Sequence, residues 1–295
     1  MKGAIGNYER TSSGGFALVD DENGLSQHFQ DGGSSSRWYR RFAAGCKARM
    51  GSVVKKNLAL GIKLILKVLD KIDEKMAFED ENNNSTERDR WVIAGAYIAI
   101  SFVLSLRGNE GFMMDIKELM KNQSLEKGLV WIILSGIIKG ESTPMLHQLR
   151  SVPVTSSGIN IELWRDRLIA VHTEAGRTEG PAICDTDGYL MSNTAMNELF
   201  WAALEEVYWE APDSFPKDIR SVKDIKTHIN IYRSLRRSSN SRAISEGVMK
   251  TDIDIVERWR NEQASKGQAP SEAMHIGYAD QELLNKCFER YTRSM

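Results

Sequence analysis

Arginine is the residue whose number and spacing in this sequence could do chemistry. The stretch YRSLRRSSNSRAISEGV at 232–248 carries Arg233, Arg236, Arg237 and Arg242 on what reads as an amphipathic helix. A guanidinium offers a planar fork of N–H donors, stays charged at any working pH and grips a phosphate through two hydrogen bonds at once. Two guanidinium groups brought together from distant parts of a chain could neutralise a phosphodiester while a nucleophile attacks it.

A further arginine and a tyrosine extend this chemistry. Arg107 follows a long apolar stretch, which places its charged head at the rim of a buried core. Tyr278 lies beyond a segment that carries Trp259 and could act as the nucleophile. A phenol ionises near pH 10, so it needs a base or a strongly cationic pocket to lose its proton during attack. Tyr291 competes with it, although a tyrosine in this position more usually packs a terminal helix.

Other chemistries lack the residues they require. The five histidines have no metal-ligand spacing, and the three cysteines suggest neither a zinc motif nor a disulfide framework. The sequence contains no GxxxxGKS/T or GxGxxG loop for a nucleotide. The serine run 238–241 lacks the GxSxG elbow of a hydrolase, so we expect these serines in a turn or on a helix surface. We therefore expect no metal and no cofactor.

Charge argues for local recognition of a polyanion. The 295 residues contain 39 lysines and arginines against 40 acids, for a net charge of −1. Residues 37–67, however, hold nine basic side chains and no acid. Contacts from such residues to phosphates bind DNA without reading its bases. The residues expected to make them are Arg40, Arg41, Arg49, Lys55, Lys56, Arg177, Arg237 and Arg242.

Hydropathy gives no support for a membrane partner. The longest apolar stretches, 91–106 and 128–138, are shorter than the roughly 20 residues that span a bilayer, so both are expected in a buried core. The N-terminal residues lack the apolar region of a secretory signal. The expected compartment is therefore intracellular and reducing, and nuclear if the source is eukaryotic.

Patterning predicts an α+β fold that is predominantly helical, with a small antiparallel sheet. Residues 124–140 fit either a helix or a buried strand, and 79–89 read as a surface loop. Residues 158–184 mix β-branched side chains with glycine turns, which favours two or three short strands joined by hairpins. The expected helices are 58–72 with a basic outer face, 90–107 capped by Gly108 and Gly111, 113–122, 192–210, 227–247, 251–264 and 280–292.

Three short boxes resemble the tyrosine recombinases and integrases, and among these the Crypton-like kind carried by eukaryotic transposons. SLRGNE (105–110) resembles the box with the first catalytic arginine and a nearby acid. RSLRR (233–237) is similar to the His-x-Leu-Arg box. DIVERWR followed by HIGYAD resembles the region of the third histidine or tryptophan and the nucleophilic tyrosine. The resemblance covers about residues 37–295.

The resemblance implies a domain organisation. Residues 1–36 would be a flexible Gly/Ser-rich tail, and 37–89 a basic helical segment followed by an acidic loop. Residues 90–295 would form the catalytic domain. The basic segment would be a possible remnant of the region that clamps the opposite face of the DNA.

The resemblance also implies roles for single residues. Arg107 and Arg236 would bind the scissile phosphate, and Trp259 would pack against it or hydrogen-bond to it. Tyr278 would attack phosphorus and leave a 3′-phosphotyrosyl link, without a metal. The substrate would be double-stranded DNA, cleaved and rejoined in site-specific recombination or integration. By analogy, a tetramer would assemble on the DNA and exchange helix 280–292 between protomers.

Two positions depart from the family pattern. Arg233 stands where the family has the first histidine of its second box, and an arginine cannot accept a proton. The family also carries a lysine on a β-hairpin as general acid. Here no lysine occurs between Lys139 and Lys217, and Arg177 and Glu179 are the nearest candidates. Loss of a general acid costs about 10²–10⁴ in rate.

These departures leave three functions open: an active recombinase, a catalytically impaired DNA-binding descendant, and a helical protein-interaction module. In the last, the arginines would only be solvated, which is the simpler explanation for Arg237 and Arg242 in any case. Arg107 would then form a surface pair with Glu110, worth about 0.2–0.5 kcal/mol. Trp259, taken alone, is more often a core residue than a catalytic one.

Overall fold

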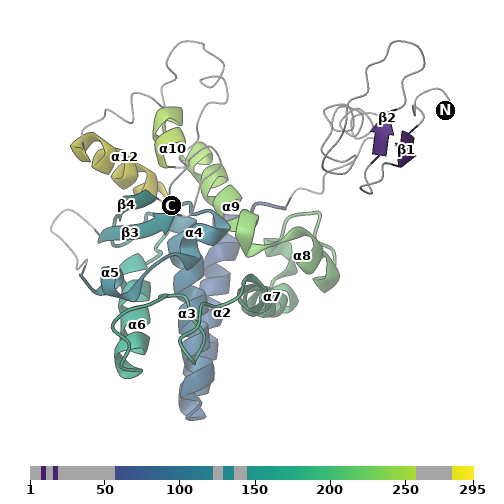
Figure 1. Cartoon of the computed structure of the whole chain (residues 1–295). Helices are drawn as coiled ribbons and strands as arrows, with labels where there is room; N and C mark the ends of the chain where they lie inside the picture. Colours follow the sequence, from purple (N-terminus) through teal and green to yellow (C-terminus); the bar gives the residue numbers. More distant parts are fainter. Residues whose placement is uncertain (1–7, 11–15, 19–56, 122–128, 136–144, 257–280) are drawn as a thin grey trace. The chain divides into compact units, whose positions relative to one another are not determined.

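The computed structural model describes residues 8–10, 16–18, 57–121, 129–135, 145–256 and 281–295. The chain divides into two compact units, 1–55 and 56–295 (Figure 1). In the first unit, β1 (Tyr8–Arg10) pairs antiparallel with β2 (Phe16–Leu18). The segment expected to be a flexible tail thus contains a short pair of strands.

In its described residues, the second unit is predominantly helical and carries a two-stranded antiparallel sheet, so the α+β prediction is confirmed. The unit includes both the basic helix of the 37–89 segment and the residues that follow it. Its elements, in chain order, are α2 (Ile62–Glu81), α3 (Ser85–Val103), α4 (Gly108–Phe112), α5 (Ile116–Lys121), β3 (Leu129–Ser135), β4 (Met145–Ser151), α6 (Ile161–Glu174), α7 (Asn193–Glu210), η1 (Pro212–Ser214), α8 (Val222–His228), α9 (Ile231–Ser245), α10 (Lys250–Val256) and α12 (Gln281–Ser294).

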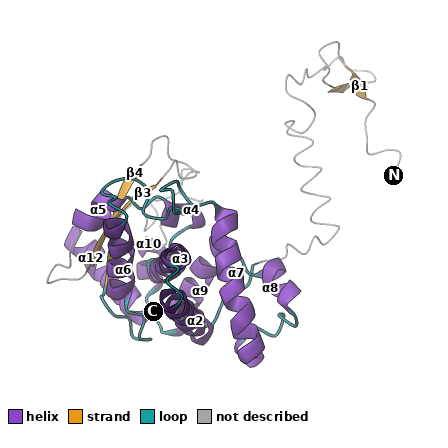
Figure 2. Cartoon of the chain, turned by 90° about the horizontal axis from the view of Figure 1, so that it is seen from below, coloured by secondary structure: helices purple, strands orange, loops and turns teal. Residues whose placement is uncertain are grey.

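The helix α3 forms the centre of this unit. Every residue from Trp91 to Val103 is buried, because the helix is apolar on all sides and packs against α2, α6 and α9. Figure 2 shows α3 and α2 side by side, with α6 on one side of the pair and α7 on the other. Contact with α6 is close: a Cβ built on Gly95 would lie 2.2 Å from the ring of Trp164.

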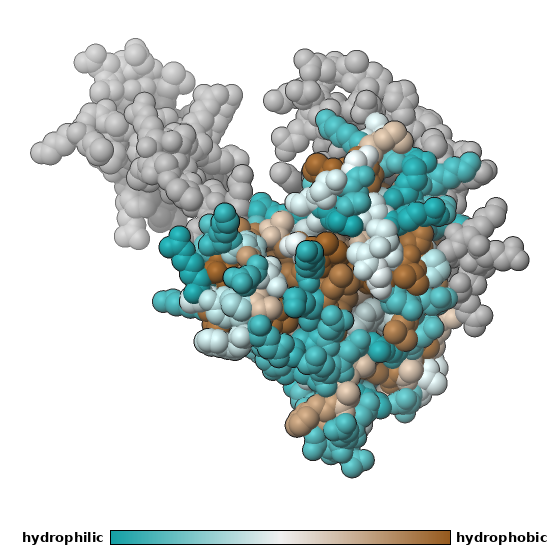
Figure 3. Space-filling view, turned by 180° about the vertical axis from the view of Figure 1, so that it is seen from behind, coloured by the Kyte–Doolittle hydropathy of each residue, from teal (hydrophilic) through white to brown (hydrophobic). Residues whose placement is uncertain are grey.

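Among the described residues, no helix has the length and apolar character needed to cross a membrane. Figure 3 shows the face opposite to that of Figure 1, where hydrophilic residues cover much of the surface and apolar residues lie between them.

The basic face expected on 58–72 is limited to the start of α2. Lys63 and Lys67 are exposed, but Lys71 is buried and pairs with Glu74 and Glu210, which ties α2 to α7.

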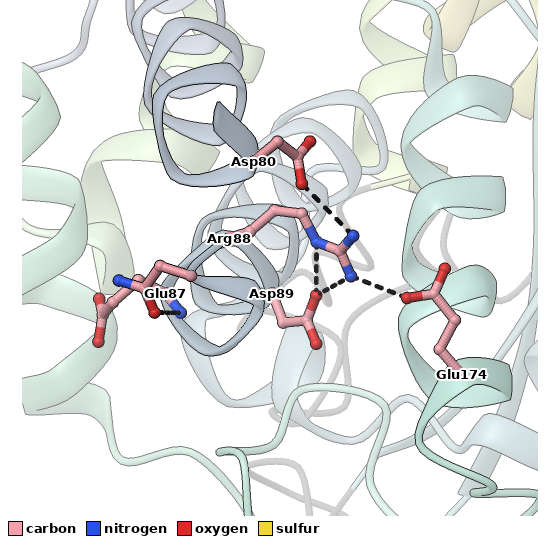
Figure 4. Close-up of polar contacts among 6 residues, drawn as sticks. Asp80, Glu87, Arg88, Asp89 and Glu174 are labelled. Carbon is pink, nitrogen blue, oxygen red and sulfur yellow. Dashed lines mark hydrogen bonds and ion pairs between the residues drawn. The ribbon is translucent and has the colours of Figure 1, made fainter. Parts of the chain in front are cut away.

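The turn between α2 and α3 is anchored by a charge network centred on Arg88 (Figure 4). Its guanidinium donates to Asp89 at 2.7 and 2.9 Å, and to Glu174 of α6 at 2.8 Å. The hydrogen bond to Asp89 raises the pKa of the Arg88 guanidinium above its ordinary value. Only residues 82–84 lie between the two helices. The loop predicted at 79–89 is therefore shorter than expected, because both helices extend into that segment.

The sheet does not lie where the sequence predicted it. The pair β3–β4 spans 129–151, with Leu129 opposite Ser151 and Ser135 opposite Met145. Trp131 Nε1 donates to Ser151 Oγ at 2.8 Å across this pair. The ambiguous segment 124–140 therefore contains a strand, because LVWIILS is short and β-branched.

The prediction of strands in 158–184 was wrong, since helix α6 occupies most of this segment. Asn160 caps α6 by accepting from the backbone N–H of Leu163 at 2.9 Å. The buried positions of α6 fall at helical spacing. Gly176, at φ +68°, ends the helix through the hydrogen bonds Gly176 N to Thr173 O and Arg177 N to His172 O. The β-branched side chains concealed this helical period.

Helix α6 also buries a histidine. His172 is fully buried, and its Nε2 lies 2.9 Å from the carbonyl oxygen of Ala182, so Nε2–H is the donor. Burial lowers the pKa of His172 below its ordinary value of 6.5. The folded state thus binds this proton less readily than the unfolded state does. The stability that depends on neutral His172 is complete above about pH 6.5 and decreases as the pH falls toward the lower pKa of the folded state.

We expect His172→Gln to reduce the loss of unfolding free energy between about pH 7.5 and pH 5.5, because glutamine does not titrate. Urea unfolding of wild type and variant at both pH values measures this. His228→Gln, at a half-buried histidine in α8, should keep the wild-type dependence on pH. An identical loss in wild type and His172→Gln would contradict the assignment.

Candidate phosphate-binding site

Arg107 is positioned by the turn that ends α3. The backbone N–H of Ser105 donates to Phe102 O at 3.2 Å, and that of Leu106 to Ser101 O at 2.9 Å. This pair of bonds is a Schellman motif, whose left-handed residue is usually glycine. Here it is Ser105, at φ 50° and fully buried. The helix thus ends at Val103, earlier than predicted, and the chain turns sharply just before Arg107.

Arg236 reaches this same turn from α9. Its Nη1 donates to the carbonyl oxygen of Ser105 at 3.0 Å, across 131 residues of sequence. Leu235 is fully buried and anchors this turn of the helix in the core. The start of α9 is fixed by Asn230, whose Oδ1 accepts from the N–H of Tyr232 at 2.8 Å. The fold therefore brings the two predicted arginine boxes together.

Glu110 fixes the backbone of Arg107. One carboxylate oxygen accepts from the Arg107 N–H at 2.8 Å, and the other lies 3.6 Å from Arg107 Nη1. The ion pair considered from the sequence does form. It is not a pair of two solvated groups, since Glu110 is buried while the side chain of Arg107 remains 34% exposed. The carboxylate sets the direction of an arginine at the surface.

Gly108 and Gly111 do not cap α3, contrary to the prediction, but allow α4 to pack closely. A Cβ on Gly111 would lie 2.6 Å from the ring of Tyr97, and one on Gly108 would lie 2.3 Å from the ring of Tyr232. The hydroxyl of Tyr97 donates to Gly108 O at 2.9 Å. Burial raises the pKa of Tyr97, so this phenol remains a donor. Helix α4 is thereby held between α3 and α9.

The remaining arginines of α9 lie in different surroundings. Arg233 is exposed, one turn before Arg236. Arg237 donates to Asn57 O at 2.5 Å, which fastens the chain ahead of α2. Arg242 donates to Ser294 O at 3.2 Å and pairs with Glu246 at 2.6 Å. Arg237 and Arg242 thus have structural partners, and their contact with DNA stays a prediction.

Ser238 and Ser239 of α9 are not surface residues, which corrects the prediction for 238–241 at these two positions, while Ser241 is exposed as expected. Ser238 Oγ accepts from Leu60 N–H at 2.7 Å, and Ser239 Oγ lies 2.9 Å from the hydroxyl of Tyr291. Both serines are buried. Small hydroxyl side chains let α2 and α12 approach α9 while their polar groups find partners.

Tyr291 has the packing role that the sequence suggested as its alternative. It is fully buried beside Ser239. Helix α12 packs on β4, α9 and α10 of its own chain, and the Arg290 guanidinium donates to both oxygens of Asp252 at 2.7 and 2.8 Å. The segment proposed for exchange between protomers therefore packs within the same chain in this structure.

Arg177 lies on no hairpin. Its Nη1 contacts Cys184 Sγ at 2.9 Å and its Nη2 donates to Thr186 O at 3.2 Å, so it braces the loop after α6. The sheet at 129–151 has the sequence 136–144 between its strands, and this stretch includes Lys139. Lys139 was not a candidate before the fold was known, because the hairpin was expected within 158–184. The short β-branched run between Gly128 and Gly136 was the signal that could have found it.

Several predicted site residues lie outside the described residues. These are Tyr278, Trp259, Arg40, Arg41, Arg49, Lys55 and Lys56. Within the described part of the chain, no group of three or more histidine, cysteine, aspartate or glutamate side chains could hold a metal ion. No protein-family model and no curated protein matches this sequence.

Ser105 provides a direct test of the turn. We expect Ser105→Gly to stay within about 1 kcal/mol of wild type in unfolding free energy, because glycine adopts positive φ without strain. Ser105→Val should lose about 2 kcal/mol or more, since a β-branched residue is strained at φ 50°. Chemical denaturation measures both. Equal stability of the two variants would refute the left-handed turn.

Proposed function

We propose that this protein is a tyrosine recombinase that cleaves and rejoins double-stranded DNA. The observation that carries the proposal is the hydrogen bond from Arg236 to Ser105 O, which places the SLRGNE and RSLRR boxes side by side. Arg107 follows this turn, and Arg233 precedes Arg236 by one turn of helix. Three arginines from two distant segments thus belong to one region, as the grip on a phosphodiester requires.

The position of the sheet supports the same reaction. Strand β3 packs against α4, the helix that follows Arg107. The residues between β3 and β4 include Lys139, so the hairpin lysine of the family has a counterpart in this sequence. Lys139 is therefore the residue that we propose for the role of general acid. Arg233 in place of histidine remains a departure.

In the proposed reaction, Arg107 and Arg236 neutralise the non-bridging oxygens of the scissile phosphate. The phenol oxygen of Tyr278 attacks phosphorus as its proton passes to a water molecule, and the bond from phosphorus to the 5′-oxygen breaks. Lys139 gives its proton to that oxygen, which departs as a hydroxyl group. Attack by a second 5′-hydroxyl on the phosphotyrosine reverses these steps and joins a new strand. Arginines lower the cost of the negative charge in both transition states.

Tyr278→Phe should abolish the covalent protein–DNA adduct, because phenylalanine has no nucleophilic oxygen. Suicide duplexes with a nick or a bridging 5′-phosphorothiolate trap the adduct, which is resolved on a denaturing gel. Because the target is undefined, the duplexes are a pool taken from the flanks of the gene.

Tyr291→Phe is the matched control, and it should keep the adduct. It removes the hydrogen bond to Ser239, so we expect it to lose about 0.5–1.5 kcal/mol of stability. An adduct that survives Tyr278→Phe would refute the assigned nucleophile. DNA binding without any adduct would favour the impaired descendant, and the absence of both would favour the protein-interaction module.

A further inference from the structure

Tyr232 is an aromatic residue at the arginine site with no role in the proposed reaction. It lies where the SLRGNE and RSLRR boxes meet, although no motif in the sequence singles it out. Cδ2 of its ring would be 2.3 Å, and its Cα 2.8 Å, from a Cβ on Gly108. Gly108 is the residue that directly follows Arg107. The start of α4 therefore packs against the start of α9 at this residue, through both the ring and the Cα of Tyr232.

Two hydrogen bonds hold the backbone at the start of α9, one at Tyr232 and one at the preceding residue. Its N–H donates to Asn230 Oδ1 at 2.8 Å, and the N–H of Ile231 donates to Asn197 Oδ1 of α7 at 3.1 Å. Tyr232 is nevertheless 38% exposed, so it contributes less to the core than a buried aromatic residue. Its position is thus well determined while its contribution to stability is limited.

We propose that Tyr232 is a positioning residue, whose ring sets the separation between Arg107 and Arg236. The Arg236–Ser105 hydrogen bond pulls the turn before α4 toward α9, and the ring on Gly108 stops the approach. An attractive contact at Ser105 and a steric contact at Gly108 together fix the distance between the α3–α4 turn and α9. This inference rests on the proposed DNA cleavage, in which a displacement of about 1 Å can cost about 10²-fold in rate.

Two variants separate the ring from its hydroxyl. Tyr232→Ala removes the ring from Gly108 and leaves only the backbone contact, and we expect the single-turnover rate of adduct formation at saturating DNA to fall about 10-fold to 100-fold. DNA affinity and the midpoint of thermal unfolding should change little, since both arginines remain. Tyr232→Phe keeps the ring and should restore the wild-type rate. Tyr189→Ala, at a tyrosine that is 73% exposed on the loop before α7, is the matched control and should leave the rate unchanged.

A second pair tests the contact from the side of Gly108. Gly108→Ala inserts a methyl group against the ring and should also slow adduct formation. The double variant Gly108→Ala/Tyr232→Ala should recover only the part of that loss that comes from the ring, because the Cα of residue 232 still lies 2.8 Å from the added methyl position.

The outcomes separate this inference from the proposed function. A rate for Tyr232→Ala within about twofold of wild type would overturn the positioning role while leaving the recombinase proposal intact. A loss in Tyr232→Phe equal to that in Tyr232→Ala would overturn it as well, since the hydroxyl and not the ring would then act. The absence of an adduct in wild type would overturn the proposed function, and this inference with it.

Discussion

The hydrogen bond from Arg236 to the carbonyl oxygen of Ser105 is the interaction on which the arginine site depends. A hydrogen bond from a charged donor contributes about 1.5–3 kcal/mol, enough to keep one arrangement of two segments. The acceptor points toward α9 because Ser105 adopts a left-handed conformation that serine otherwise avoids. A guanidinium carries five N–H donors, so a bond to the backbone is compatible with a second ligand. The left-handed conformation of Ser105 thus helps to position both Arg107 and Arg236.

The rest of the fold keeps the ends of α3 and α9 in place. Helix α3 is buried along most of its length, and Arg88 anchors its start to α6. Helix α9 is held by two neighbouring segments, by Leu60 N–H on Ser238 and by Tyr291 on Ser239. Movement of either helix would have to break buried polar contacts, which is costly in a low dielectric. The charged groups therefore sit at the junction of two rigid elements.

Much of this arrangement could be predicted from the sequence, and the failures have physical reasons. Helix α7 and its cap Ser192 follow the predicted 192–210, because an N-cap serine and an apolar period agree there. The sheet was misplaced because Ile, Val and Trp occur both in β3 and in α6, and β-branched residues do not exclude a helix. The glycines of α4 were taken as caps because a close approach between helices leaves no mark in one sequence. For the same reason, Tyr232 and the left-handed Ser105 could not be recognised before the fold was known.

We propose that the α3–α4 turn and α9 together bind the phosphates of DNA. The most direct test of this proposal is the salt dependence of binding to a labelled duplex, measured by fluorescence anisotropy. Each phosphate contact contributes about 0.9 to the slope of log affinity against log salt concentration. We predict that Arg107→Gln reduces this slope by about 1, while Arg293→Gln, at an exposed arginine of α12, leaves it unchanged. No binding at moderate salt, or the same slope in wild type and Arg107→Gln, would contradict the account.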